Sequence, residues 1–172
     1  EVLNEILNVQ GLTVEYPGFT LGPCSFSMKR GEILAAAGES GSGKTTLARA
    51  LSRLLEEEAA VAGEVVIAGS SLYEKKEEEV RRIRMELFSI VFQNSGEWLN
   101  PSMRLREQLR ETLIKKYPAR EHRERMKTLM EMVGLEETDL ERYPDQLSGG
   151  MAQKFLLANA MALTPEMVIL DE

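Results

Sequence analysis

The pattern of hydrophobic positions changes at about the middle of the chain. The first half carries short apolar runs of strand length, separated by Gly, Pro, Ser and charged residues. Residues 33–37, Ile-Leu-Ala-Ala-Ala, predict a buried strand, and residues 12–15, 65–67 and 89–92 predict further strands. A last apolar run, residues 167–170, predicts a central parallel strand. The alternation of strands and turns indicates an α/β core.

The second half, from residue 94 to residue 165, has the spacing of helices. Four apolar residues of a predicted helix, 120–133, fall at i, i+3, i+4 and i+7 and make one stripe. They are Met126, Leu129, Met130 and Val133. A methionine-rich stripe of this kind is more often part of a core than a docking groove. The single histidine, His122, lies among charged residues of the same helix, so we expect it to face solvent and to bind no metal.

A glycine-rich turn joins the predicted strand 33–37 to a helix-forming run. It reads Gly-Glu-Ser-Gly-Ser-Gly-Lys-Thr and matches G-x-x-x-x-G-K-[ST], a motif whose backbone N–H groups cradle phosphates. Lys44 adds a positive charge, Thr45 adds a hydroxyl that can bind magnesium, and the helix dipole favours an anion at this end. An ordinary Gly/Ser-rich turn needs no Lys-Thr pair after its last glycine. The residues expected to contact a nucleotide are Gly38, Glu39, Ser40, Gly41, Ser42, Gly43, Lys44, Thr45 and Thr46.

A second glycine pair, Gly149 and Gly150, precedes a predicted helix over residues 152–163. Ser148 as a simple helix N-cap is the plainest interpretation of the sequence Leu-Ser-Gly-Gly-Met. However, two glycines in a first turn each cost about 1 kcal/mol against alanine, and Met151 cannot close a capping box. Helix stability alone therefore does not explain them. Because glycines carry no side chain, they let a phosphate approach the backbone.

Two carboxylates, Asp171 and Glu172, follow the predicted strand 167–170. Open α/β sheets place ligands at the carboxyl ends of their strands, where a carboxylate can hold magnesium or polarise a water molecule. Acidic residues after a strand are also common on protein surfaces. The pair gains its functional interpretation from the two glycine-rich motifs elsewhere in the chain.

The three motifs together resemble those of the ATP-binding cassette (ABC) ATPases. In this comparison residues 38–45 correspond to the Walker A motif, residues 147–150 to the signature and residues 167–172 to Walker B. The resemblance implies an α/β fold, with a P-loop NTPase (RecA-like) core, an antiparallel β flank and an inserted helical subdomain. It also implies ATP and Mg²⁺ as cofactors.

The resemblance further implies how the chain divides. We expect residues 1–93 to form the nucleotide-binding core, residues 94–165 the helical subdomain with the signature, and residues 166–172 the Walker B strand that returns to the core. The family's D-loop and switch histidine find no match in residues 1–172, so the ABC core is expected to be incomplete at its C-terminus.

Roles in catalysis follow from the resemblance, residue by residue. Lys44, Gln93 and Glu172 match the catalytic residues of the family, and Glu172 is expected to polarise the attacking water. Magnesium is expected to be held by Thr45, Gln93 and Asp171.

The resemblance also implies contacts with the base and with a second subunit. Tyr16 matches the aromatic residue that stacks on adenine, whereas a plain surface tyrosine is the alternative. Ser148, Gly149 and Gly150 match the residues that bind the γ-phosphate of ATP held by a partner ABC subunit. The partner is therefore a second ABC ATPase subunit, in a homodimer or a heterodimer.

Finer resemblance points to the ATPases of oligopeptide, dipeptide and nickel importers. Residues 99–101, Leu-Asn-Pro, and residues 143–147, Tyr-Pro-Asp-Gln-Leu, carry it. Ala152, Lys154 and residues 94–98 depart from the family pattern, which leaves the transported solute open. The resemblance implies an ATP-hydrolysing importer subunit that powers separate transmembrane permease subunits and lies in the cytoplasm, on the cytoplasmic face of the membrane.

Composition changes this picture little. The chain has 172 residues, 43% of them hydrophobic, which is one domain's worth with a real core. A balance of 21 basic against 28 acidic residues gives a net charge of −7, so we expect no nucleic-acid partner. One cysteine excludes an intramolecular disulfide, and no apolar run reaches 18 residues. Two alternatives stay open: a soluble ABC ATPase that acts on DNA or the ribosome, and a nucleotide-binding fragment without turnover.

Overall fold

The computed structural model describes residues 4–92 and 95–171, and the chain divides into two compact units. Unit 1 contains Glu1–Phe88 together with Asp171, and unit 2 contains Ser89–Leu170. Each unit is described by itself below. The domain boundaries expected from the sequence stay a prediction.

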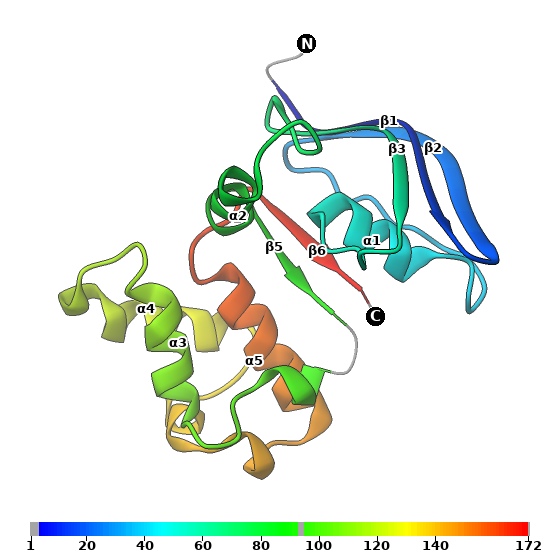
Figure 1. The fold of residues 1–172 in the computed structure, drawn as a ribbon. Helices are drawn as coiled ribbons and strands as arrows, with labels where there is room; N and C mark the ends of the chain where they lie inside the picture. The colour runs from blue at the N-terminus through cyan, green and yellow to red at the C-terminus, as the bar shows by residue number, and fades with distance from the viewer. Residues whose placement is uncertain (1–3, 93–94, 172) are drawn as a thin grey trace. The chain divides into compact units, whose positions relative to one another are not determined.

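Unit 1 is built on a four-stranded antiparallel sheet with the strand order β2-β1-β3-β4 (Figure 1). Its strands are β1 (Glu5–Tyr16), β2 (Phe19–Lys29), β3 (Ala60–Ile67) and β4 (Ser70–Ser71). The predicted strands 12–15 and 65–67 lie inside β1 and β3. Leu12 and Val14 alternate with more exposed residues in β1, as one face of an antiparallel strand requires. This sheet is the antiparallel β flank expected from the sequence.

Two helices, α1 (Lys44–Ser52) and α2 (Glu77–Glu86), complete unit 1. The end of α1 is tied to the segment after β4. The Tyr73 hydroxyl donates to the carbonyl oxygen of Ala50 at 2.8 Å, and Arg53 Nη1 donates to the carbonyl oxygens of Leu72 and Lys75 at 3.1 and 2.5 Å. The Ala50 carbonyl, one of the last in the helix, also accepts from the backbone N–H of Arg53 at 3.1 Å, so Tyr73 adds a second donor to it.

The predicted strand 33–37 is wrong. The segment has no regular secondary structure, and Ile33 and Leu34 are 97% and 52% exposed. Neither sheet of the described chain pairs with it. The composition explains the failure, since three of the five residues are alanines, which have low strand propensity and bury little surface. Without a neighbouring strand, such a run gains too little from burial to become ordered as a strand.

Unit 2 combines a two-stranded sheet, β5–β6, with a group of helices. Figure 1 shows the arrows of β5 and β6 running in the same direction, so this pair is parallel, and the helices form the long crossover between them. The strands match the predicted runs 89–92 and 167–170. The elements are β5 (Phe88–Val91), η2 (Ser95–Trp98), α3 (Leu105–Leu113), α4 (Ala119–Met132), η3 (Glu137–Glu141), η4 (Pro144–Gln146), α5 (Gly149–Met161) and β6 (Met167–Leu170).

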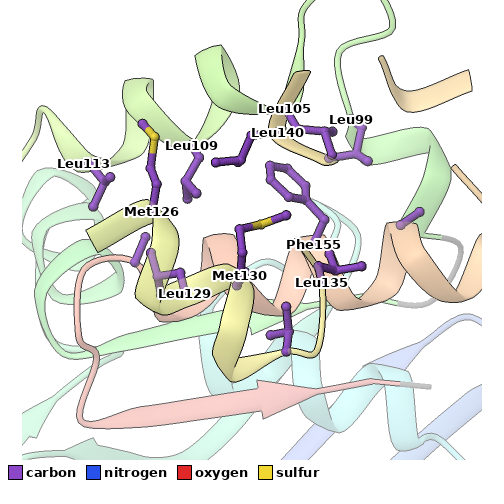
Figure 2. Close-up of a cluster of buried hydrophobic side chains, with 14 residues drawn as sticks. Leu99, Leu105, Leu109, Leu113, Met126, Leu129, Met130, Leu135, Leu140 and Phe155 are labelled. Atoms are coloured by element: carbon purple, nitrogen blue, oxygen red, sulfur yellow. The ribbon is translucent and has the colours of Figure 1, made fainter. Parts of the chain in front are cut away.

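The core of unit 2 lies among α3, α4 and α5 (Figure 2). The predicted methionine stripe is part of it, with Met126 and Met130 of α4 buried in the same cluster as Leu109 of α3 and Phe155 of α5. Each such side chain contributes about 1.5–3 kcal/mol by leaving water. The prediction of a core, rather than a docking groove, is therefore confirmed. Across residues 4–92 and 95–171, every helix is too short or too polar to span a bilayer.

The prediction that His122 faces solvent is wrong. Its side chain is buried, and Nε2 hydrogen-bonds the carbonyl oxygen of Tyr117 at 2.9 Å. Position 122 precedes Met126 by one helical turn, so the apolar stripe of α4 extends over it despite its charged sequence neighbours. The carbonyl of the preceding loop supplies the partner that a buried imidazole needs.

Candidate nucleotide site

The glycine-rich loop of unit 1 is closed by a lysine. Lys44 Nζ donates hydrogen bonds to the carbonyl oxygens of Gly38 and Glu39, both at 2.8 Å. The backbone N–H of Ser42 donates to the Glu39 carbonyl at 3.2 Å. These bonds curl the loop around the ammonium group. Because residues 38–42 are exposed, an anion that entered the loop would compete with these carbonyls for the charge of Lys44.

Gly43 is required where it stands for two independent reasons. Its φ of 97° lies in the left-handed region that glycine adopts without steric cost. A Cβ at this position would come within 2.9 Å of Leu21 Cδ1 and 3.0 Å of Phe19 Cζ, both from β2. Sequence reasoning missed Phe19 and Leu21, whose side chains pack against the loop at Gly43. The period-two alternation along residues 19–29 signals that the two share a face, but it does not say what that face contacts.

The amino end of α1 is suited to bind an anion. Its first turn contains no acidic residue, and no side chain of the described residues caps the helix at Gly43. The N–H groups of a first helical turn have no partners within the helix, and the helix dipole places partial positive charge there. Together with Lys44, these groups can bind a phosphate.

Thr45 and Asp171 meet across 126 positions of sequence. Thr45 Oγ1 donates a hydrogen bond to Asp171 Oδ1 at 3.2 Å, and both residues belong to unit 1. The hydroxyl lies in the first turn of α1, and the carboxylate follows β6 directly. A hydroxyl and a carboxylate oxygen are both ligands that Mg²⁺ accepts, and this ion usually completes its shell with water and phosphate oxygens.

Two of the predicted catalytic residues, Gln93 and Glu172, lie outside the described residues. In the remainder, no group of three or more His, Cys, Asp or Glu side chains could hold a metal by itself. The roles of Gln93 and Glu172 therefore stay predictions.

Tyr16 ends β1 and lies close to the loop through its hairpin partner. Tyr16 pairs with Phe19 across the β1–β2 turn. Phe19 is one of the two side chains that meet the Cβ position of Gly43. The Tyr16 side chain is half-buried, so part of it is open to a planar ligand. Adenine stacking on Tyr16 stays a prediction, supported by its position next to Phe19 and by its partly exposed side chain.

Unit 2 presents the second glycine motif at the amino end of α5. Ser148 is the N-cap, and its Oγ accepts a hydrogen bond from Met151 N at 3.3 Å. The interpretation of Ser148 as a helix cap is therefore confirmed, but it does not explain the two glycines. A Cβ added to Gly149 or Gly150 would meet no atom within 4 Å in the described chain. Both residues are exposed, and neither has a positive φ. Nothing in the described chain therefore requires glycine at these two positions.

The comparisons with known proteins agree with this geometry. The family model described as ABC transporter matches residues 21–172. A di/tripeptide transport ATP-binding protein of Pseudomonas aeruginosa is 39% identical over 154 residues, which cover 88% of this chain and 46% of that protein. The oligopeptide transport ATP-binding protein of Escherichia coli is 34% identical over 176 residues, covering 97% of this chain and 52% of that protein. The chain thus spans about half the length of the curated relatives it matches.

Solved structures show the same fold. The dimeric ABC transporter cassette MJ0796 superposes with a TM-score of 0.85 at 28% identity, over 97% of this chain and 74% of the other. A post-hydrolysis state of that cassette, bound to ADP and Pi, gives 0.84 at 28% identity, again over 97% and 74% of the two chains. The α/β P-loop NTPase architecture with an antiparallel flank and a helical subdomain is thereby confirmed, although strand 33–37 is not formed. With a family match over most of its length and relatives above 30% identity, the chain belongs to the ATP-binding cassette family of the ABC transporters.

Proposed function

We propose that this chain is the ATP-binding and ATP-hydrolysing part of an ABC importer subunit for peptides. The observation that carries the proposal is the hydrogen bond between Thr45 and Asp171 beside the loop that Lys44 closes. Lys44 and the first-turn N–H groups of α1 bind the β- and γ-phosphates. Thr45 and Asp171 would hold the Mg²⁺ ion that accompanies them. When bound there, Mg²⁺ would supply positive charge against the charge that develops on the phosphates.

The remaining roles rest on the resemblance of the sequence to the motifs of the family. Gln93 orients water and contributes to the Mg²⁺ shell, and Glu172 polarises the attacking water. Tyr16 stacks on adenine. Each of the three stands at or shortly after the end of a strand predicted from the sequence, which is where α/β sheets present the groups that bind ligands.

The chemistry requires a second ABC subunit. Ser148, Gly149 and Gly150 offer a hydroxyl and two bare backbone positions, which suits contact with the γ-phosphate of ATP bound to a partner. The relatives at 34–39% identity are peptide transport ATP-binding proteins, which supports a peptide importer. The subunit pair then acts on transmembrane permease subunits at the cytoplasmic face of the membrane. The net charge of −7 gives a nucleic-acid partner no support.

Magnesium-dependent ATP binding tests the site. We expect isothermal titration to show tighter ATP binding when Mg²⁺ is present, because Thr45 and Asp171 can then contribute. Thr45→Val and Asp171→Asn should remove most of the Mg²⁺ effect and leave binding without Mg²⁺ nearly unchanged. Thr128→Val is the matched control, because the Thr128 hydroxyl lies on α4 and donates to the Glu124 carbonyl of its own helix at 3.0 Å. A Mg²⁺ effect of wild-type size in both variants would contradict the assignment of the pair.

Transport tests the rest of the proposal. The full-length protein with its permease, reconstituted in vesicles, should hydrolyse ATP faster when a di- or tripeptide is supplied, and should accumulate the peptide. A parallel assay with Ni²⁺ separates the two solute classes of the subfamily. Stimulation by Ni²⁺ alone would replace the peptide assignment, and stimulation by nucleic acid would contradict the importer altogether.

A further inference from the structure

The turn between α5 and β6 contains a residue in an unfavourable backbone conformation. Thr164 has a φ of 53°, in the left-handed region. Three non-glycine residues of the described chain have positive φ, namely Arg53, Ala68 and Thr164, and the threonine is the one that is β-branched. A branched Cβ makes this region costly, so the surrounding structure must hold Thr164 in place.

Two neighbouring side chains hold the turn. Lys116 Nζ donates to the carbonyl oxygen of Leu163 at 2.7 Å and to Thr164 Oγ1 at 2.9 Å. The Tyr117 hydroxyl lies 3.1 Å from Thr164 Oγ1, at hydrogen-bonding distance. Lys116 and Tyr117 come from the loop between α3 and α4, far from the turn in sequence. We call these three residues, Lys116, Tyr117 and Thr164, the turn clamp.

The loop side of the turn clamp is itself fixed. The Arg125 guanidinium of α4 lies 3.3 Å from the centre of the Tyr117 ring. The buried His122 hydrogen-bonds the Tyr117 carbonyl oxygen at 2.9 Å. Arg125 also pairs with Glu121 one turn earlier in the helix, at 2.9 Å. The turn clamp therefore joins the α5–β6 turn to α4 through Tyr117, which is held at both its backbone and its ring.

The turn connects the two elements of unit 2 that carry the signature motif and the strand before Asp171. The helix α5 begins at the glycine motif capped by Ser148, and β6 delivers Asp171 at its end (Figure 1). Residues 162–166 are the whole connection between these two elements. The conformation of Thr164 thus sets how the signature helix and the Walker B strand of unit 2 follow one another.

From this geometry we infer that Lys116 and Tyr117 are positioning residues for ATP hydrolysis, which act by holding Thr164 in its left-handed conformation. Their effect is exerted through the turn, not through a contact with ATP or Mg²⁺. When the turn clamp is lost, the turn relaxes, and the connection from α5 to β6 no longer holds the strand that precedes Asp171 in the conformation that the reaction needs. This inference rests on the proposed ATPase function.

The test uses the full-length protein and separates kcat from KM. We expect Lys116→Met to lower kcat about tenfold, since small misplacements of reacting groups are costly, with the KM for ATP nearly unchanged. Tyr117→Phe removes the hydroxyl but keeps the ring beside Arg125, and it should lower kcat less. Lys115→Met is the matched control, because Lys115 is an exposed lysine with no side-chain partner in the described part of the chain.

Rescue distinguishes positioning from simple structural support. Glycine adopts the left-handed conformation without help, so Thr164→Gly should keep a kcat within about twofold of wild type. In the Thr164→Gly background, Lys116→Met should have almost no further effect. A wild-type kcat for Lys116→Met, or the same loss in the glycine background, would overturn the inference.

Hydrogen exchange tests the turn clamp independently of turnover. The amides of residues 163–170 should exchange faster in Lys116→Met than in wild type, and the double variant with Thr164→Gly should show no added increase over Thr164→Gly alone. Unchanged exchange in Lys116→Met would contradict the turn clamp. A wild-type protein without ATP turnover would instead contradict the proposed function, so the two failures are distinguishable.

Discussion

Helices α1 and α5 begin in similar ways but use glycine for different reasons. Each follows a glycine-rich or Ser-Gly-Gly segment, and neither has an acidic residue in its first turn. In α1 the N-cap is Gly43, which no other residue can replace without strain and crowding against Leu21 and Phe19. In α5 the N-cap is Ser148, and the two glycines after it have free space around them.

The difference shows which binding surface the chain builds for itself. The α1 loop is shaped by its own unit, with Lys44, Phe19 and Leu21 fixing its form. The α5 terminus is open, and its glycines lower helix stability without a compensating contact inside the described chain. We attribute them to an external group that approaches the backbone closely, in line with the γ-phosphate of a partner's ATP proposed above.

The largest expected effect is the loss of ATP binding when Lys44, at the start of α1, is removed. Lys44→Ala should weaken ATP binding about 100-fold or more, because a charge-assisted contact to phosphate is lost, and turnover should disappear with it. Lys115→Ala is the control. Filter binding or titration calorimetry measures the affinity. If Lys44→Ala bound ATP as tightly as wild type, the α1 loop would not be the nucleotide site.

At α5 the same assays should give a different result. Ser148→Arg places a long side chain where the partner's phosphate must approach, so turnover of the full-length pair should fall by about two orders of magnitude or more. ATP binding to each chain should stay within about twofold of wild type, since Ser148 does not belong to the chain's own phosphate loop. Loss of ATP binding in the isolated Ser148→Arg chain would contradict the assignment of α5 to the partner's ATP, because it would place Ser148 in the chain's own binding site.

Alanine substitutions at the glycines should change stability in opposite directions. Gly43→Ala should lower the free energy of unfolding by about 2 kcal/mol, because a left-handed φ is unfavourable for alanine and the neighbouring side chains must shift. Gly150→Ala should raise it by about 0.5–1 kcal/mol, because alanine is the better helix former, while turnover falls. Urea unfolding of both variants measures the two signs. A destabilised Gly150→Ala would mean that the chain itself needs that glycine.

Hydrophobic spacing was sufficient to predict several elements. The stripe from Met126 to Val133 predicted both the helix α4 and its buried face, because a period of 3.6 over two turns is specific. The run 167–170 predicted β6. Residues 33–37 gave the same kind of signal and failed, because an alanine-rich run depends on partner strands, which its own sequence does not contain.

Chemical motifs predicted the residues of the site better than their surroundings. The motifs assigned Thr45 and Asp171 to one magnesium site, and the hydrogen bond between the two side chains agrees with that assignment. The walls formed by Phe19 and Leu21 depend on how β2 meets the loop, and no local pattern encodes that contact. His122 shows the converse error, because its charged sequence neighbours point away from the face on which it lies.

The smallest expected effect concerns the other end of α1, where Tyr73 anchors the helix through Ala50. Burial raises the pKa of Tyr73 to about 12, with Arg53 opposing the shift and Tyr16 adding to it. Because the folded pKa lies above the unfolded value, the contribution to stability is complete below pH 10 and is lost as the pH rises from 10 through 12. Tyr73→Phe should cost about 1 kcal/mol at neutral pH through the lost hydrogen bond. The difference in free energy of unfolding between wild type and Tyr73→Phe should shrink by about 1 kcal/mol between about pH 9 and pH 11, after allowance for the solvent that reaches the half-buried ring.

Urea unfolding of both proteins at matched pH values measures this difference. A gap between them that stays constant up to about pH 11 would show that the Tyr73 hydroxyl does not anchor α1 in the way the hydrogen bond indicates.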